Sequence, residues 1–384
     1  MTFPETSLDE LGPPVGHWTA REIAQQPDVW LTIEKQMSGA AGATQAFLEP
    51  LLSRKELRIV LTGAGTSACV GECLAPALTR RFGMRVHAIA TTDLVAAPDA
   101  WLSETAPVLL VSFARSGNSP ESVAAIALAE QISSDCHHLI IACNRDGELY
   151  RKGTTLPNAY VILLPDETND RGFAMTSSFS SMLLGAALAF ELLAAPTTAA
   201  LSRWAGQILA TFPSFAHLSK KGFERVVYLG SREFKGLARE AALKMLELTD
   251  GRIVAVSETP LGFRHGPKTI INTKTLVVMF LCNDPYTRAY ELDLLAELIN
   301  DGIAARVVVL TAGDAAVSAS DEVRLADAAG AAELNLCFPF AVFVQSLALQ
   351  QSLALGLQPD SPNAAGVVNR VVEGVSLNHW DPRR

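Results

Sequence analysis

The chain is organised around an apolar run that ends in a turn rich in glycine and hydroxyl groups. It reads Leu57-Arg58-Ile59-Val60-Leu61-Thr62-Gly63-Ala64-Gly65-Thr66-Ser67. The apolar run is typical of a buried strand, and a helical stretch over residues 68–81 follows the turn. Main-chain N–H groups and the helix dipole favour an anion at such a turn. A plain capped turn without a ligand has the same signature, because Ser and Thr are ordinary helix caps.

A second turn of this kind follows the predicted strand 108–111. It reads Ser112-Phe113-Ala114-Arg115-Ser116-Gly117-Asn118-Ser119. Parallel strands deliver such turns to one edge of the sheet, so both turns can close on one phosphate, with Arg115 adding a charge-assisted contact. The glycine spacing departs from the dinucleotide fingerprint and no Walker lysine is present. We therefore expect neither NAD nor ATP.

Strand and helix signals alternate along the whole chain, which indicates parallel sheets covered on both faces. The strands starting near 58, 108 and 138 recur near 225, 276 and 306, an offset of about 168 residues that predicts a duplicated unit. Chance similarity between Val-rich strands is the alternative. We expect an α/β fold of two tandem flavodoxin-like units, each a three-layer αβα sandwich. The expected boundaries are 1–45 for an N-terminal helical segment, 46–200 for the first unit and 201–384 for the second.

The composition sets the protein class. Of 384 residues, 49% are hydrophobic and 18% charged, which is enough to bury large cores, and the net charge of -9 argues against a nucleic-acid partner. The six cysteines lack zinc-site spacing, so we expect buried thiols in a reducing cytoplasm and no metal. Met1–Pro14 lacks the apolar core of a signal peptide. Two apolar segments, 179–195 and 338–357, contain polar residues and fit helices packed on a sheet better than membrane spans.

The second half carries a set of charged residues with helical spacing. Glu240, Lys244 and Glu247 lie at positions i, i+4 and i+7, so they share one helix face, and their neighbours are mostly apolar. A partly buried carboxylate there can act as a proton shuttle. A surface ladder of ion pairs is the alternative.

With both turns in view, the sequence resembles the SIS (sugar isomerase) family, whose phosphate signature is Gly-x-Gly-Thr-Ser followed by Ser-Gly-x-Ser. Segments 170–178, 262–268 and 368–372 extend the resemblance to the AgaS subfamily of galactosamine-6-phosphate deaminases and tagatose-6-phosphate ketose/aldose isomerases. The resemblance implies that the phosphate is bound by Thr66, Ser67, Arg115, Ser116 and Ser119. It implies further substrate contacts from Gly65, Ser112, Ala174 and Thr176.

The resemblance also implies catalytic roles, taken from the isomerase half of glucosamine-6-phosphate synthase. Glu247 would move a proton between C1 and C2, Lys244 would assist at the ring oxygens, and Glu240 would orient its neighbours. His265 matches the ring-opening histidine, for which imidazole chemistry is suited. That histidine comes from an adjacent subunit, which implies a homodimer or homotetramer with the active site at the subunit interface. The relative's Schiff-base lysine has no counterpart near Arg370.

The AgaS resemblance implies the reaction of D-galactosamine 6-phosphate with water to give D-tagatose 6-phosphate and ammonia, without a cofactor. No glutaminase-sized segment precedes the first repeat, so we expect degradation rather than synthesis. Three alternatives stay open: aldose–ketose isomerisation without loss of the amine, glucosamine 6-phosphate as the substrate, and a sugar-phosphate sensor without catalysis.

Overall fold

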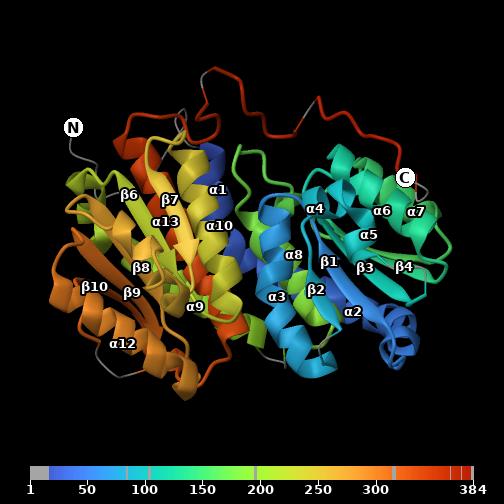
Figure 1. Cartoon of the computed structure of the whole chain (residues 1–384), viewed down its shortest axis with the longest axis horizontal. Coiled ribbons are helices and arrows are strands. Elements are labelled where there is room, and N and C mark those ends of the chain that lie inside the picture. Colours follow the sequence, from blue (N-terminus) through green and yellow to red (C-terminus); the bar gives the residue numbers. More distant parts are fainter. Residues whose placement is uncertain are drawn as a thin grey trace. The chain divides into compact units, whose positions relative to one another are not determined.

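The computed structural model of the chain contains two five-stranded sheets, all of whose strand pairs are parallel. The described residues are 17–83, 85–102, 105–193, 197–313, 317–363, 365–372 and 374–381. Met1–Pro14, for which the sequence predicts no signal peptide, lies outside them. Figure 1 shows each sheet with its flanking helices.

The first sheet has the strand order β2-β1-β3-β4-β5. Its strands are β1 (Arg58–Thr62), β2 (Val86–Ala88), β3 (Val108–Ala114), β4 (Cys136–Ala142) and β5 (Ala159–Leu163). The associated helices are α2 (Gln26–Leu52), α3 (Thr66–Phe82), α4 (Thr91–Ala96), α5 (Pro98–Trp101), α6 (Pro120–Ile132), α7 (Glu148–Thr155), the 3-10 turn η2 (Asp166–Thr168) and α8 (Ser177–Ala189).

Both faces of the first sheet are covered. On one face Val60 and Leu110 belong to a core cluster with Leu94 of α4 and Ile126 of α6. On the other face α3 lies beside α8 (Figure 1) and comes so close to β1 that a Cβ on Gly71 would lie 3.0 Å from that of Leu61. This is the predicted three-layer arrangement, and its strand run is buried as expected.

The second sheet has the order β10-β9-β8-β6-β7, which is the order of the first sheet repeated. Its strands are β6 (Arg225–Leu229), β7 (Val254–Glu258), β8 (Thr275–Phe280), β9 (Arg306–Ala312) and β10 (Asp321–Leu325). The associated helices and 3-10 turns are α1 (His17–Ala24), α9 (Thr197–Thr211), η3 (Phe212–Lys221), α10 (Glu233–Leu248), α11 (Pro260–Phe263), η4 (Pro267–Ile270), α12 (Pro285–Asp301), η5 (Ala326–Ala328) and α13 (Glu333–Ala354). The two sheets thus have the matching strand order that a repeat of one α/β unit predicts.

Each sheet is the centre of a compact unit, and neither unit is continuous in sequence. The unit of the first sheet includes α8, most of α2 and the described residues after 364. The unit of the second sheet includes α1 and Arg171–Thr176. The boundaries at 46–200 and 201–384 stay predictions.

The apolar helix α13 lies in the core of the second unit. Among the described residues it is the one helix long and apolar enough to cross a membrane, and 89% of its apolar window is buried inside the protein. Phe338 and Phe340 are fully buried within it, and Phe340 packs against Phe234 of α10. This burial accounts for its composition, as the sequence predicts for helices packed on a sheet.

Candidate functional site

The turn after β1 has the backbone that the glycines predict. A Cβ on Gly63 would lie 2.5 Å from Cβ of Ser67, so the first turn of α3 excludes any side chain there. Gly65 precedes α3 with φ 56° and ψ -125°, a conformation that is costly for other residues. These two glycines allow the start of α3 to lie directly over the end of β1.

The hydroxyl groups of this turn are well placed to contact a ligand at the helix start. Thr66 and Ser67 are buried, and Oγ1 of Thr66 has no hydrogen-bond partner among the described residues. No side chain caps α3. The hydroxyl groups therefore do not cap the helix, and the N–H groups of Ser67 and Ala68 donate instead to the carbonyls of Ala64 and Gly65.

The turn after β3 is held by its neighbours. A Cβ added to Gly117, whose φ is 69°, would lie 3.2 Å from the Cα of Gly147. The carbonyl of Ser116 accepts a hydrogen bond from the Asn144 side chain at 2.8 Å. Ser119 donates its hydroxyl to Glu121 at 2.5 Å, and Ser116 Oγ accepts from the Asn118 N–H at 3.3 Å.

Arg115 is nearly buried and contacts the C-terminal segment. Its Nη2 donates to the main-chain carbonyl of Arg370 at 2.6 Å. The side chain of Arg370 in turn donates to the carbonyl of Asp170 and to Asn169 Oδ1. The segment around residue 370 is thus tied to the second turn. The sequence resemblance marks this segment but does not predict the contact.

Two further buried hydroxyl groups accompany Ser112 at this edge. Thr62 ends β1 and Thr91 begins α4, and neither belongs to the motif residues predicted to bind substrate. The side-chain oxygens of all three lack a hydrogen-bond partner in the described structure. Thr62 ends the apolar strand run 57–62, and a hydroxyl residue at the end of such a run is a sequence signal for a ligand contact. Thr91 follows a strand that the sequence pattern does not reveal.

The equivalent turn of the second repeat contains its own cation. Gly230 repeats the close approach of Gly63, here to Phe234. Arg232 takes the place of Gly65, with φ 54° and ψ -127°. Its guanidinium lies 3.1 Å from Asp284 and 3.8 Å from Glu333. Burial opposes the charge, but Glu333, Glu233 and Asp284 together raise the pKa of Arg232. An internal ion cluster thus occupies the second turn.

The predicted acid–base set lies on α10. Lys244 and Glu240 are fully buried, and the Glu247 side chain is one-quarter exposed. Lys244 Nζ lies 3.6 Å from a Glu240 oxygen and forms a short ion pair with Glu247. The prediction that the three groups share one partly buried helix face is confirmed. The surface-ladder alternative is wrong, because two of the three side chains are inaccessible.

His265 lies on an exposed turn between α11 and η4. The flanking residues pin this turn to α12. Arg264 pairs with Asp293 at 2.7 Å and with Glu297 at 2.8 Å, and Lys268 pairs with Asp301 at 2.6 Å. In the described residues no hydrogen bond or ion pair joins His265 to α10. The turn is therefore fixed while its imidazole is presented outward.

Ala174 and Thr176 belong to the unit of the second sheet and are fully buried. Gln345 of α13 donates to the carbonyl of Thr176 at 3.2 Å. At the start of the same segment, Glu22 of α1 accepts the N–H groups of Arg171 and Gly172. These contacts fix the backbone of the loop.

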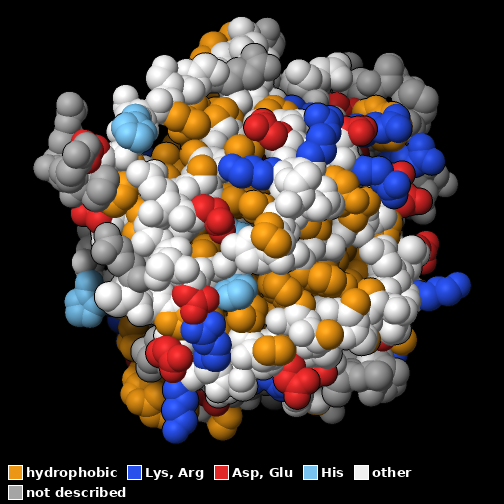
Figure 2. All heavy atoms as spheres, turned by 90° about the vertical axis from the view of Figure 1, so that its right-hand side faces the viewer, with side chains coloured by type: hydrophobic (Ala, Val, Ile, Leu, Met, Phe, Trp, Pro, Cys, Tyr) orange, Lys and Arg blue, Asp and Glu red, His pale blue; other side chains and the backbone are white. Residues whose placement is uncertain are grey.

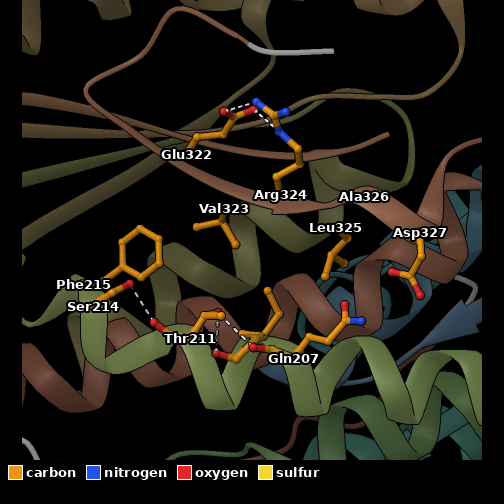
Figure 3. A pocket seen from close by; sticks show the side chains of 11 residues that line it. Gln207, Thr211, Ser214, Phe215, Glu322, Val323, Arg324, Leu325, Ala326 and Asp327 are labelled. Atoms are coloured by element: carbon orange, nitrogen blue, oxygen red, sulfur yellow. Dashed lines mark hydrogen bonds and ion pairs between the residues drawn. The ribbon is translucent and has the colours of Figure 1, made fainter. Parts of the chain in front are cut away.

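A cavity of about 630 Å³ lies elsewhere, between α9, η3 and β10 (Figure 3). Its lining includes none of the predicted site residues. Thr211 and Ser214 donate their hydroxyls to main-chain carbonyls, and Arg324 pairs with Glu322. Since these polar groups already have partners, the cavity is a weaker ligand site than the two turns.

Another titratable cluster lies at the opposite, amino-terminal edge of the first sheet. His138 is fully buried in β4, with Nε2 2.6 Å from Glu130 and 3.6 Å from the Cys136 sulfur. Burial lowers the pKa of His138, and Glu130 only partly offsets this. Burial raises the pKa of Cys136 to about 12, which keeps a thiol. No disulfide involves any of the six cysteines, and all six are buried, as predicted.

Comparisons with known proteins agree with these motifs. The SIS domain model matches residues 51–192. A D-galactosamine-6-phosphate deaminase AgaS of Escherichia coli is 44% identical over 370 residues, covering 95% of this chain and 96% of that protein. The crystal structure of tagatose-6-phosphate ketose/aldose isomerase from Escherichia coli superposes with a TM-score of 0.88 at 41% identity, covering 96% and 99% of the two chains.

A more distant structure shares the fold alone. The C-terminal domain of glucosamine-fructose-6-phosphate aminotransferase from Francisella tularensis gives a TM-score of 0.74 at 17% identity. It covers 90% of this chain and 98% of that domain.

Proposed function

Since the chain belongs to the AgaS family of SIS-domain proteins, we propose that it deaminates an amino-sugar phosphate. D-Galactosamine 6-phosphate and water would give D-tagatose 6-phosphate and ammonia. The observation that carries this proposal is the acid–base set on α10, where the buried Lys244 lies between Glu240 and the partly exposed Glu247. A sensor that only binds sugar phosphate has no need of such a set.

The phosphate is bound by the first unit in this proposal. The main-chain N–H of Thr66, at the start of α3, and the hydroxyls of Thr66 and Ser67 donate to its oxygens. Ser116 and Ser119 add hydroxyls from the second turn, and Arg115 adds positive charge. Gly65 and Ser112 complete this part of the site, and Ala174 and Thr176 also contact the substrate.

The chemistry is a proton transfer followed by hydrolysis. His265 opens the sugar ring, which exposes the C1 aldehyde. Glu247 removes the proton from C2 and returns a proton to C1, while O1 gains a proton and the amine loses one, so the C2 amine becomes a ketimine and C1 an alcohol. Water adds to C2 and ammonia leaves, which gives the ketose. Carbon C1 is reduced while C2 is oxidised, so the reaction balances without an external electron donor.

Lys244 supports the proton transfer by its charge. Its ammonium lies against both carboxylates, so positive charge stands beside the Glu247 side chain where the proton is handled. Glu240 in turn holds the ammonium in place. The positions of these three side chains are fixed by the packing of α10 against α13.

We propose a homodimer or homotetramer in which His265 serves the site of a neighbouring subunit. Its exposure on a turn pinned to α12 supports this arrangement. One face of the molecule also presents apolar side chains gathered at its centre (Figure 2), as subunit interfaces do. We place the protein in the cytoplasm, in sugar catabolism.

A substrate panel tests the proposed reaction. Purified protein is mixed separately with galactosamine 6-phosphate, glucosamine 6-phosphate and a neutral aldose 6-phosphate, and both ammonia and ketose are measured. We expect ammonia from galactosamine 6-phosphate at the highest kcat/KM. Greater release from glucosamine 6-phosphate would reassign the substrate.

Isomerisation without deamination is the second candidate. The name of the Escherichia coli structural relative supports it, as does the fact that the same base and ring-opening group would serve. Ketose from the neutral aldose phosphate, with no ammonia from either amino sugar, would establish this candidate. No turnover together with tight binding would instead identify a sensor.

A further inference from the structure

Three hydroxyl groups of the first unit are buried without partners in one place. Thr62, Thr91 and Ser112 are each at most 2% exposed, and each side-chain oxygen lacks a hydrogen-bond partner in the described structure. Buried hydroxyls are almost always hydrogen-bonded, because leaving one unpaired is costly. Three such groups together indicate that a polar partner belongs there.

The backbone brings the three groups together. Thr62 and Ser112 are register partners on the adjacent strands β1 and β3. They alternate with residues of the opposite face, so they share the side of Val60 and Leu110, the side that packs on α4. Thr91 is the first residue of α4, and its N–H donates to the carbonyl of Gly63 at 2.9 Å. The three residues therefore neighbour one another at the edge of the sheet where the β1–α3 turn begins.

The order in which the chain adds strands to the sheet reverses at this place, between β1 and β3. The strand order β2-β1-β3 puts α3 on one face and α6 on the other, and ligands of open α/β sheets bind at the carboxyl ends of the strands where this reversal occurs. Thr66, with its own unpartnered hydroxyl, lies on the α3 side of this position. Thr62, Thr91 and Ser112 lie on the α4 side.

We propose that Thr91 and Thr62 bind the phosphate of the substrate, together with Ser112, as a hydroxyl floor below the two turns. This inference rests on the proposed function and extends it to two residues outside the motifs. Hydroxyls can each donate one hydrogen bond without adding charge, which suits phosphoryl oxygens already facing Arg115 and the main-chain N–H of Thr66. The phosphate oxygens accept hydrogen bonds from these otherwise unpartnered hydroxyls.

The test is Thr91→Val, which keeps the shape of the side chain and removes its hydroxyl. Inorganic phosphate is the probe, titrated by calorimetry, because it is not turned over. We expect its Kd to rise about tenfold, the loss of roughly one hydrogen bond to a charged group. The Tm of the ligand-free protein should stay the same or rise, since an unpartnered hydroxyl has been removed. Thr91→Ser should restore phosphate binding.

Thr198→Val is the matched control. Thr198 lies in α9 of the other unit, is 1% exposed and also has an unpartnered Oγ1. Its variant should keep the wild-type Kd for phosphate. Wild-type phosphate affinity in Thr91→Val would overturn the inference. A fall in the ligand-free Tm of Thr91→Val would overturn it too, because the hydroxyl would then serve the fold.

The result separates the inference from the proposed reaction. If galactosamine 6-phosphate yields no ammonia but Thr91→Val still weakens phosphate binding, the floor stands and the deaminase assignment fails. If ammonia is released and Thr91→Val has an unchanged KM and Kd, the deaminase assignment stands and the floor is wrong.

Discussion

Glu247 is the residue on which the proposed chemistry depends. It is the accessible member of a set whose other members, Glu240 and Lys244, are fully buried. Glu247→Gln keeps the size of the side chain and removes the base. We expect kcat to fall about 100- to 10,000-fold with little change in KM. Full activity in this variant, measured by ammonia release, would remove Glu247 from the mechanism.

Arg232 tests the cost of replacing glycine at a repeated turn. Its φ of 54° matches that of Gly65 in the first repeat, but only Arg232 has a Cβ. Arg232→Ala and Arg232→Gly both remove the ion pairs with Asp284 and Glu333, yet only glycine relieves the backbone strain. We expect the glycine variant to be more stable in urea by about 1 kcal/mol. Equal stabilities would mean that the turn is unstrained.

At the scale of the element, sequence predicts the buried central strands and the edge strand β5, but it misses the other edge strands, β2, β7 and β10. The runs at β1, β3, β4, β6, β8 and β9 are continuous and apolar, so they stand out. The short β2 and the half-exposed β7 and β10 mix polar and apolar residues. For this reason the sequence points to Ser112, which lies in the apolar run of β3, but not to Thr91, which follows β2.

The residues of the candidate site also differ in whether the sequence predicts them. Turn residues such as Thr66 and Ser116 are predictable because glycine and hydroxyl residues cluster at strand ends. The face shared by Glu240 and Lys244 follows from helical spacing. The contact between Arg115 and the carbonyl of Arg370 does not, because it joins residues 255 apart in the sequence by a main-chain group.

The amino-terminal end of β4 should make stability depend on pH. The pKa of His138 lies below its usual 6.5 in the folded chain, through burial. The neutral His138 therefore contributes fully to the free energy of unfolding above pH 6.5. This contribution is lost as the pH falls below 6.5, because the unfolded chain takes up the proton first. Burial opposes the charge of Glu130, but hydrogen bonds from His138 and Asn158 lower its pKa, which adds loss below about pH 4.5.

We therefore expect His138→Gln to flatten the fall of Tm between pH 7.5 and 5.5. At pH 7.5 the variant should be less stable by about 1–2 kcal/mol, through the lost hydrogen bond to Glu130. The neighbouring contacts of Arg54 and His137 with Asp135 are left in place in this variant. A pH profile identical to that of the wild type would exclude His138 as the titrating group.

At the scale of the whole molecule, the question is whether His265 and Glu247 of one active site come from different subunits. In a mixed oligomer of His265→Ala and Glu247→Gln chains, sharing across subunits leaves one kind of site with both groups intact. We expect co-expressed variants to recover activity well above either alone, up to about a quarter of wild type for random dimers. Light scattering gives the oligomer size. No recovery from a verified mixed oligomer would place both groups in one chain.

One strand order recurs in the two sheets, but the residues at the equivalent turns differ. The first repeat has the glycine turn and unpartnered hydroxyls, whereas the second has an internal ion cluster at the same turn and the acid–base helix after it. Binding of one phosphate per chain, rather than two, follows from this division.

The ratio of ammonia to ketose tests the central claim most directly. Wild-type protein is given galactosamine 6-phosphate, and ammonium and ketose phosphate are measured in the same reaction, with Glu247→Gln alongside. We predict one ammonium for each ketose phosphate, and release of both products at least about 100-fold slower from the variant. Ketose without ammonium, or ammonium at the wild-type rate from Glu247→Gln, would contradict the account.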